Sequence, residues 1–144
     1  MRNFAIIGFP IKHSFSPEYF KEKFIQESVK DASYVAIEVA EISDIRQVIR
    51  THNLAGFNVT IPHKQTILPH LDGISEAARV IGAVNTVTVR DGALYGDNTD
   101  YIGFRKSVRN LLRSGFQSAL IFGTGGSSLA VKFALEQLGV LYST

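Results

Sequence analysis

The sequence predicts an α/β protein with a mainly parallel sheet, and three observations support this class. Apolar, β-prone segments alternate along the chain with segments of helical periodicity. The first of them, residues 4–8, is a continuous apolar run, which is typical of a strand covered on both faces. Near the other end, a Gly-rich turn at residues 123–128 joins an apolar strand to an apolar helix. We therefore expect a three-layer domain followed by the start of a nucleotide-binding unit.

Composition restricts the possible partners. With 144 residues, of which 45% are hydrophobic, the chain can bury a core of its own. A net charge of +2 with dispersed Lys and Arg argues against nucleic acid and is compatible with a small anionic ligand. The lack of cysteine excludes disulfides and thiolate metal sites, and we expect no metal. The apolar run at residues 4–7 is too short for a signal sequence or a membrane span, so we expect a cytoplasmic protein.

The first two thirds of the chain contain strand and helix signals in alternation. Strands are expected at residues 4–8, 34–39 and 56–60, and Asp91-Gly92 predicts a hairpin between residues 83–89 and 93–95 at the sheet edge. Helices are expected to open at Ser16-Pro17, at a Ser43 cap and at Lys64, the last running to Leu71. Their apolar faces comprise Phe20, Phe24 and Ile25 in the first helix, and Ile45, Val48 and Ile49 in the second, which should end near Asn53.

The last third has a different pattern. A helix is expected over residues 99–114, with Gly115 as its stop and with Phe104, Val108, Leu111 and Leu112 buried. A strand at residues 119–122 then leads through the Gly-rich turn into a helix that ends at Gly139. Residues 140–144 form another apolar, β-prone run.

The stretch from Gly56 to Lys64 is the strongest candidate for a functional site. Because side chains alternate along a strand, Asn58 and Thr60 should point to one face and Phe57 and Val59 to the other. Pro62 suits the first position of a helix, which places the Lys64 ammonium unfavourably near the positive end of the helix dipole.

A nearby carboxylate would stabilise and orient the Lys64 ammonium. The candidate is Asp100, in the first turn of the next long helix. The alternatives are that Lys64 is a surface lysine and that Asp100 is an ordinary acid at a helix start.

Polar residues elsewhere in the chain could complete a site. Ser14 and Ser16, just before a helix, could direct two hydroxyls at one anion. The alternative is that Ser16 is only a helix cap and Ser14 a loop residue, and we expect His13 to be structural. Asn85 lies within an apolar strand, where its amide needs partners that a polar ligand could supply.

The Gly-rich turn is a candidate site for a dinucleotide, because small residues let the backbone approach a pyrophosphate. The residues concerned are Gly123, Thr124, Gly125, Gly126, Ser127 and Ser128. Ser128 stands where the motif usually has its third glycine, and the residue that would select the cofactor lies near or past Thr144.

Taken together, these motifs resemble the shikimate dehydrogenase family, which includes the shikimate/quinate dehydrogenases. Ser-x-Ser-Pro, Asn-Val-Thr-x-Pro-x-Lys, Ala-Val-Asn-Thr, Asn-Thr-Asp and Gly-x-Gly-Gly-x-Ser follow one another in the family's order over essentially the whole chain. The resemblance implies a substrate-binding domain at residues 1–100 and an incomplete NADP-binding Rossmann domain at residues 101–144, with the active site between them. It also implies NADP-dependent reduction of 3-dehydroshikimate to shikimate, in aromatic amino-acid biosynthesis.

The resemblance also assigns roles to individual residues. Ser14 and Ser16 would hold the substrate carboxylate, and Lys64, paired with Asp100, would exchange the proton of the reacting hydroxyl. The ring hydroxyls would be bound by Asn58, Thr60, Asn85 and Asp100.

The departure from the family is length, since family members are longer. We therefore expect an amino-terminal fragment with little or no turnover by itself, which could self-associate through an unfinished sheet edge. Two alternatives stay open: a shikimate/quinate dehydrogenase that uses NAD or NADP, and a non-catalytic shikimate-binding module.

Overall fold

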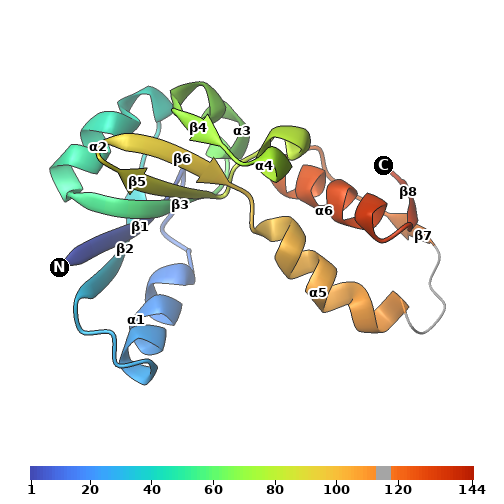
Figure 1. Ribbon diagram of the computed structural model, residues 1–144, viewed down its shortest axis with the longest axis horizontal. Helices are drawn as coiled ribbons and strands as arrows, with labels where there is room; N and C mark the ends of the chain where they lie inside the picture. Colours follow the sequence, from blue (N-terminus) through green and yellow to red (C-terminus); the bar gives the residue numbers. More distant parts are fainter. Residues whose placement is uncertain (113–117) are drawn as a thin grey trace.

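The computed structural model describes residues 1–112 and 118–144 and contains two sheets (Figure 1). The strands are β1 (Arg2–Gly8), β2 (Ala32–Glu38), β3 (Leu54–Val59), β4 (Gly73–Ile74), β5 (Thr86–Arg90), β6 (Ala93–Asp97), β7 (Ser118–Leu120) and β8 (Leu141–Ser143). The helices are α1 (Ser16–Gln26), α2 (Ile45–His52), α3 (His63–Thr66), α4 (Glu76–Ile81), α5 (Asp100–Leu112) and α6 (Gly126–Gln137), with 3₁₀ turns η1 (Ile42–Asp44) and η2 (Leu68–His70).

The larger sheet has six strands in the order β2-β1-β3-β5-β6-β4. Strand β1 runs parallel to both β2 and β3, and β4 runs parallel to β6. Strand β5 is antiparallel to β3 and to β6. The predicted hairpin forms, and Asp91 and Gly92 have φ values of 52° and 79°, as a tight β-hairpin turn requires. Its predicted place at the sheet edge is wrong, because β4 pairs with β6 outside it. The short strand β4, which the sequence analysis missed, lies outside β6 at the edge of the sheet.

Helices cover the two faces of this sheet, which gives the expected three layers (Figure 1). On one face, Ile7 and Phe57 of the sheet belong to the main apolar core together with Ile45 of α2. On the other face, α1 lies against β2, and the ring of Phe20 stacks on that of Tyr34 with centroids 4.2 Å apart. Both layers thus rest on the alternation of side chains along β1 and β3.

Three of the helices differ from the prediction. Ile25 is 71% exposed, so α1 buries a narrower face than its sequence indicated. Ser43 lies inside η1 and caps nothing, because α2 begins at Ile45 after Asp44. The helix expected over residues 64–71 is divided into α3 and η2, since Pro69 removes one backbone N–H and crowds the preceding turn.

Two further differences concern α4 and α5. Leu111 is 57% exposed rather than buried, and the predicted helix end at Ser114 and Gly115 lies outside the described residues. Helix α4 was missed by the sequence analysis, although Ser75 is its N-cap and accepts a hydrogen bond from the backbone N–H of Ala78. Serine is a preferred N-cap residue, so Ser75 was the available signal for this helix start.

The smaller sheet pairs β7 with β8 in parallel, and α6 connects them. Its core consists of Ile121, Leu135 and Val140, with Phe104 of α5 packed against them. Three apolar side chains of the strands and the following turn remain exposed, by 61%, 90% and 77%: Leu120, Phe122 and Leu141. One face of this small sheet is therefore covered by helices and the opposite face is not.

Helix α6 also contacts the part of the chain that carries the larger sheet. Ala130 of α6 packs with Ile81 and Ala83, which belong to α4 and to the segment before β5. The ring of Phe133 meets that of Tyr101 edge to face, with centroids 5.0 Å apart. These contacts fix the start of α6 beside the start of α5.

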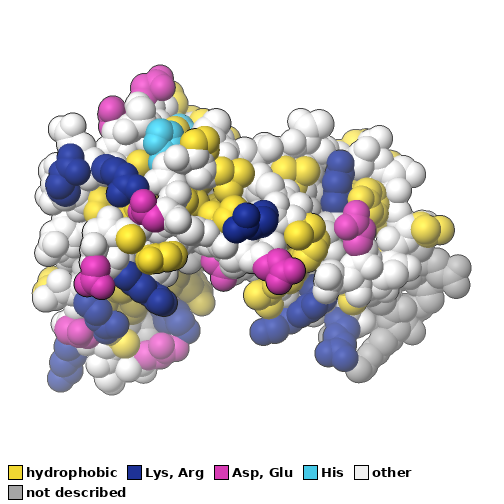
Figure 2. All heavy atoms as spheres, turned by 45° about the horizontal axis from the view of Figure 1, so that its top comes forward, with side chains coloured by type: hydrophobic (Ala, Val, Ile, Leu, Met, Phe, Trp, Pro, Cys, Tyr) yellow, Lys and Arg dark blue, Asp and Glu magenta, His cyan; other side chains and the backbone are white. Residues whose placement is uncertain are grey.

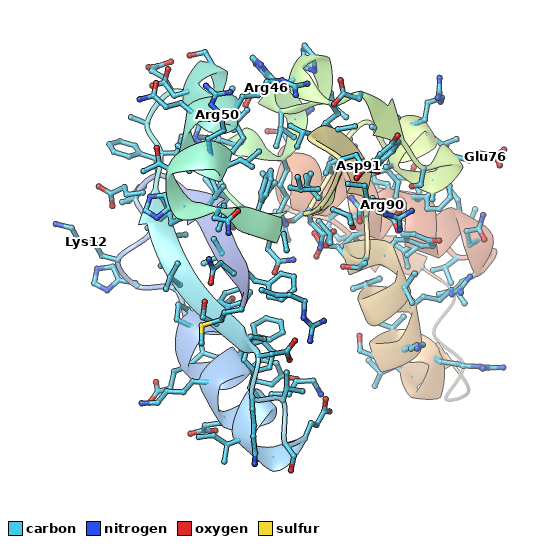
Figure 3. The ribbon with its side chains drawn as sticks, turned by 60° about the vertical axis from the view of Figure 1, so that its left-hand side comes forward. Lys12, Arg46, Arg50, Glu76, Arg90 and Asp91 are labelled. Carbon is cyan, nitrogen blue, oxygen red and sulfur yellow. The ribbon has the colours of Figure 1, made fainter. Side chains whose placement is uncertain are left out.

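On the face drawn in Figure 2, charged side chains are not gathered in one place. Figure 2 shows Lys and Arg side chains over both parts of the molecule, with Asp and Glu between them. Figure 3 shows Arg46 and Arg50 on α2, and Arg90 and Asp91 at the hairpin. Arg46 donates to both carboxylate oxygens of Asp72 at 3.0 Å and so connects α2 to the segment after η2.

The described residues contain neither a candidate membrane span nor a candidate metal site. Within residues 1–112 and 118–144, no helix has the length and apolar character that crossing a membrane requires. The same residues contain no group of three or more His, Cys, Asp or Glu side chains arranged to hold a metal ion.

Replacing Ile45 by alanine tests the core. Ile45 is fully buried, so Ile45→Ala should lower the free energy of unfolding by about 2–5 kcal/mol, measured by urea denaturation. The matched control is Ile25→Ala on the exposed side of α1, which should change it by less than about 0.5 kcal/mol. Equal losses in the two variants would contradict the described packing.

Candidate active site

A pocket of about 430 Å³ opens where the first turns of α1, α3 and α5 meet the ends of β1 and β3. Its polar lining contains all but one of the residues that the sequence analysis assigned to the substrate, the exception being Ser14. These are Ser16, Asn58, Thr60, Lys64, Asn85 and Asp100, and the apolar part of the lining is Ile6, Phe15, Tyr19, Phe20 and Val59. As predicted, Asn58 of β3 and Thr60, which follows β3, line the pocket, and Phe57 is buried in the core on the other side. Val59 belongs to the same core but also lines the pocket.

Lys64 and Asp100 form an ion pair at this pocket. The Nζ atom of Lys64 donates to Oδ2 of Asp100 at 2.7 Å, and the two side chains are 13% and 33% exposed. Lys64 is therefore no surface lysine, and Asp100 is more than an acid at a helix start. The expected influence of a helix dipole is not supported, because α3 has only four residues and begins after Pro62. The environment of the ammonium is set by its side-chain partners instead.

The other carboxylate oxygen of Asp100 is held by Asn85. Asn85 Nδ2 donates to Asp100 Oδ1 at 2.7 Å and to Thr99 Oγ1 at 3.0 Å. Its Oδ1 accepts from the backbone N–H of Thr99 at 2.8 Å and from the hydroxyl of Thr86 at 3.1 Å. Asn85 is 9% exposed. The protein itself thus supplies the partners that this amide was expected to need.

Asn58 is fixed in a similar way. Its Nδ2 donates to the backbone carbonyl of Asn85 and to Oγ1 of Thr86, both at 3.2 Å, and its Oδ1 accepts from the hydroxyl of Tyr34 at 2.7 Å. Both amide hydrogens are therefore used within the protein, and Oδ1 keeps one lone pair for a ligand. Burial raises the pKa of Tyr34, an effect that the neighbouring Ser16 hydroxyl partly offsets, so the phenol stays a donor.

The two serines before α1 are not brought to one point. Ser16 lines the pocket, whereas Ser14 lines a neighbouring hollow of about 260 Å³ that also contains His13. Ser14 Oγ accepts from the backbone N–H of Ser16 at 3.3 Å, which turns it towards its own backbone. Ser16 is the first residue of α1 rather than its cap, which is Phe15. Thr60 lines both hollows.

The Gly-rich turn precedes α6 as predicted. Gly125 is the N-cap, Gly123 has a φ of 138°, and an added Cβ at Gly125 would meet open space. The first backbone N–H groups of α6 have no partner within the helix, and the exposed turn leaves room for a phosphate group there. Ser128, which was also a candidate for the dinucleotide site, is not part of this exposed surface. It is 9% exposed and donates to the carbonyl of Gly125 at 2.7 Å, so it stabilises the turn from inside.

Sequence reasoning missed two residues of this site. Tyr34 orients the Asn58 amide, and a tyrosine inside an apolar strand was the available signal. Asn98 is fully buried; it donates to the carbonyl of Ala83 at 2.9 Å and accepts from the backbone N–H of Asp100 at 3.0 Å. It therefore fixes the start of α5, and its position two residues before Asp100 was the signal.

Comparison with protein families identifies the fold. Residues 6–87 match the family described as the shikimate dehydrogenase substrate binding domain, which is more than half of the chain. The chain belongs to this family. A shikimate dehydrogenase (NADP(+)) of Aquifex aeolicus is 41% identical over 139 residues, which cover 94% of this chain and 51% of the relative. The chain thus spans about half the length of the curated relatives it matches.

Solved structures support the assignment over both sheets. Shikimate dehydrogenase 1 of Peptoclostridium difficile superimposes with a TM-score of 0.89 at 36% identity, covering 100% of this chain and 57% of that one. Shikimate 5-dehydrogenase of Thermus thermophilus, in complex with NADP(H) and shikimate, gives a TM-score of 0.84 at 35% identity and covers 99% and 54%. The family member described here therefore shares its fold with enzymes whose structures contain substrate and cofactor.

Replacing Tyr34 by phenylalanine tests the buried phenol. Because the folded protein raises the pKa of Tyr34 above its ordinary value of 10.0, wild-type stability should fall as the pH rises through that value. At neutral pH, Tyr34→Phe should be less stable by about 0.5–1.5 kcal/mol through the lost hydrogen bond. This deficit should shrink between pH ~7 and ~11, because the variant lacks the tyrosine that resists ionisation.

Urea denaturation across this pH range gives the measurement. Tyr95→Phe, at a half-exposed position on β6, is the matched control and should change the free energy of unfolding at neutral pH by less than about 0.5 kcal/mol. If the stability difference between Tyr34→Phe and wild type stayed constant up to pH ~11, this would contradict the description of Tyr34 as a buried, neutral donor.

Proposed function

We propose that this chain carries the substrate-binding and proton-transferring part of an NADP-dependent shikimate dehydrogenase, which reduces 3-dehydroshikimate to shikimate. The observation that carries the proposal is the Lys64–Asp100 pair, 2.7 Å between charged atoms, in a pocket lined by hydroxyl and amide groups. The named relatives and the solved structures with bound shikimate support the same assignment.

The hydrogen-bonding groups of the pocket suit a hydroxylated ring acid. Asn58 Oδ1 and the Asp100 carboxylate offer acceptors, so ring hydroxyls that face them would donate. A carboxylate has no hydrogen to give and is repelled by Asp100. The substrate carboxylate would therefore face Ser16 and Thr60 at the other end of the pocket, with Ser14 in the adjoining hollow as a further candidate.

Lys64 would transfer the proton at the reacting oxygen. Its ammonium would donate to the carbonyl oxygen of 3-dehydroshikimate as that oxygen becomes a hydroxyl, and in the reverse direction its amine would accept the proton. Asp100 would orient Nζ and stabilise the charged form, and Asn85 would hold the carboxylate in place for this.

The cofactor would supply or accept the hydride. NADP fits the Gly-rich turn, where the backbone N–H groups at the start of α6 and the exposed residues Gly123 to Ser127 would hold its pyrophosphate. Ser128, which is turned inward, would shape the turn rather than touch the cofactor.

We further propose that residues 1–100 form the substrate-binding domain and residues 101–144 a part of the NADP-binding domain. The 144 residues alone should turn over little substrate. Hydride transfer needs the nicotinamide fixed at reacting distance, and a displacement of ~1 Å can cost roughly 100-fold in rate. The described part of the second sheet contains two strands, β7 and β8, with which to hold a dinucleotide.

A chimera tests the catalytic proposal. Residues 1–144 are joined to the remaining half of the Aquifex aeolicus relative, and NADPH formation from shikimate is measured. We expect activity, and we expect Lys64→Ala to lower kcat by about 10²–10⁴-fold while KM changes little, because the lysine acts on the proton in the transition state.

Lys12→Ala is the matched control for this experiment. Lys12 is an exposed lysine in the loop after β1 (Figure 3), and its removal should leave kcat unchanged. Calorimetric titration of the chimera with shikimate distinguishes the dehydrogenase from a non-catalytic shikimate-binding module. A chimera that is folded and binds shikimate, yet forms no NADPH, would favour the non-catalytic binding module over the dehydrogenase.

Self-association is expected through the small sheet, at its uncovered face as well as at its edge. Leu120 of β7, Leu141 of β8 and Phe122 after β7 expose apolar side chains, and exposed apolar patches promote association. Phe122→Ser should lower the oligomer fraction in sedimentation experiments at high protein concentration, whereas Phe15→Ser, at the exposed start of α1, should not. A wild-type chain that stays monomeric throughout would contradict this expectation.

A further inference from the structure

The Lys64 ammonium has a second partner, on the Gly-rich turn. Its Nζ atom donates to Oγ of Ser127 at 3.0 Å, in addition to the bond with Asp100. The two acceptors come from the first turns of different helices, α5 and α6. The lysine is therefore held from two sides by parts of the chain that are far apart in sequence.

The backbone around Ser127 is built for this close approach. A Cβ added at Gly126 would lie 2.7 Å from Cβ of Lys64 and 3.2 Å from Cβ of Ala83. Such a contact with the rigid base of a side chain cannot be relieved by a small rotation. The glycine thus lets α6 begin directly against the lysine, with Ser127 as the first side chain that can reach Nζ.

The neighbouring side chains of Ser127 and Ser128 have different hydrogen-bond partners. Ser128 donates to the carbonyl of Gly125, which is the local bond that serines often make near helix starts. Ser127 makes no capping bond to α6, and its recorded partner is the ammonium 63 positions away. The Ser127 hydroxyl is therefore not needed to form the helix that carries it.

We propose that Ser127 is a positioning residue for Lys64. An ammonium has three N–H groups, of which Asp100 and Ser127 engage two among the described residues. Because the two acceptors fix the rotation of the ammonium, they also fix the direction of the third N–H, which is left for a ligand in the pocket that Lys64 lines. The Gly-rich turn thereby acts on the proton-transferring group as well as on the cofactor, an inference that rests on the proposed function for its catalytic meaning.

The test observes the Lys64 ammonium in the 144-residue chain, with no ligand added. Lysine side chains are labelled with ¹⁵N, Lys64 is assigned by Lys64→Arg, and hydrogen exchange of its N–H groups is measured by NMR at low temperature. Ser127→Ala should speed this exchange about three- to tenfold, as expected for the net contribution of one hydrogen bond at a solvent-exposed position. Ser127→Thr keeps the hydroxyl and should restore slow exchange.

Ser118→Ala, which removes an exposed hydroxyl at the start of β7, is the control and should leave the exchange unchanged. Backbone amide spectra establish that each variant is folded. The proposal is overturned if Ser127→Ala exchanges as slowly as wild type, or if Ser127→Thr exchanges as fast as Ser127→Ala. Shikimate titration of the same samples reports on the proposed function separately, because the exchange measurement needs no substrate.

Discussion

The carboxylate of Asp100 is the group on which the arrangement of the site depends. One of its oxygens holds Lys64 and the other holds Asn85, at 2.7 Å each. Taking a carboxylate partly out of water is unfavourable unless charge and hydrogen bonds compensate, and here both do. Asn85 also forms hydrogen bonds with Thr86 and Thr99. A change at Asp100 would therefore disturb this set of linked polar side chains (the polar wall of the pocket) rather than one contact.

The fold delivers these groups from segments that are distant in sequence. Strand β3 leads to Lys64, the segment before β5 carries Asn85, and the return from the β5–β6 hairpin ends at Asp100. Backbone bonds hold the segments in register: the N–H of Val84 donates to the carbonyl of Lys64 at 2.7 Å. The antiparallel β5–β6 pair lies beside parallel strands and reverses the direction of the chain. It therefore places Asp100 next to Lys64, which comes 36 positions earlier in the sequence.

Sequence patterns predicted the parts of this structure that depend on local periodicity or on a motif. The alternation along β3, the Asp91-Gly92 hairpin and the start of α6 are of this kind, because each is determined by residues close in the chain. Lys64 and Asp100 were paired on chemical grounds, and their separation of 36 positions is closed only by the sheet.

What the sequence did not predict arises from tertiary packing. The division of the helix after Lys64, the exposure of Ile25 and the separation of Ser14 from Ser16 depend on neighbours that no local pattern specifies. The same holds for Tyr34, whose partner Asn58 lies 24 positions away, and for the contact between Ser127 and Lys64.

The fixed amide of Asn58 has a consequence for ligand analogues. With both of its hydrogens committed to Asn85 and Thr86, this side chain can only accept from a ligand, and Asp100 beside it also accepts. In the proposed complex, a methyl ether or a fluorine in place of the ring hydroxyl would bring its lone pairs against those of Asn58 Oδ1 and the Asp100 carboxylate, with no hydrogen between them. The pocket would thus discriminate against such compounds by polarity, even where their shape matches that of the hydroxylated ring.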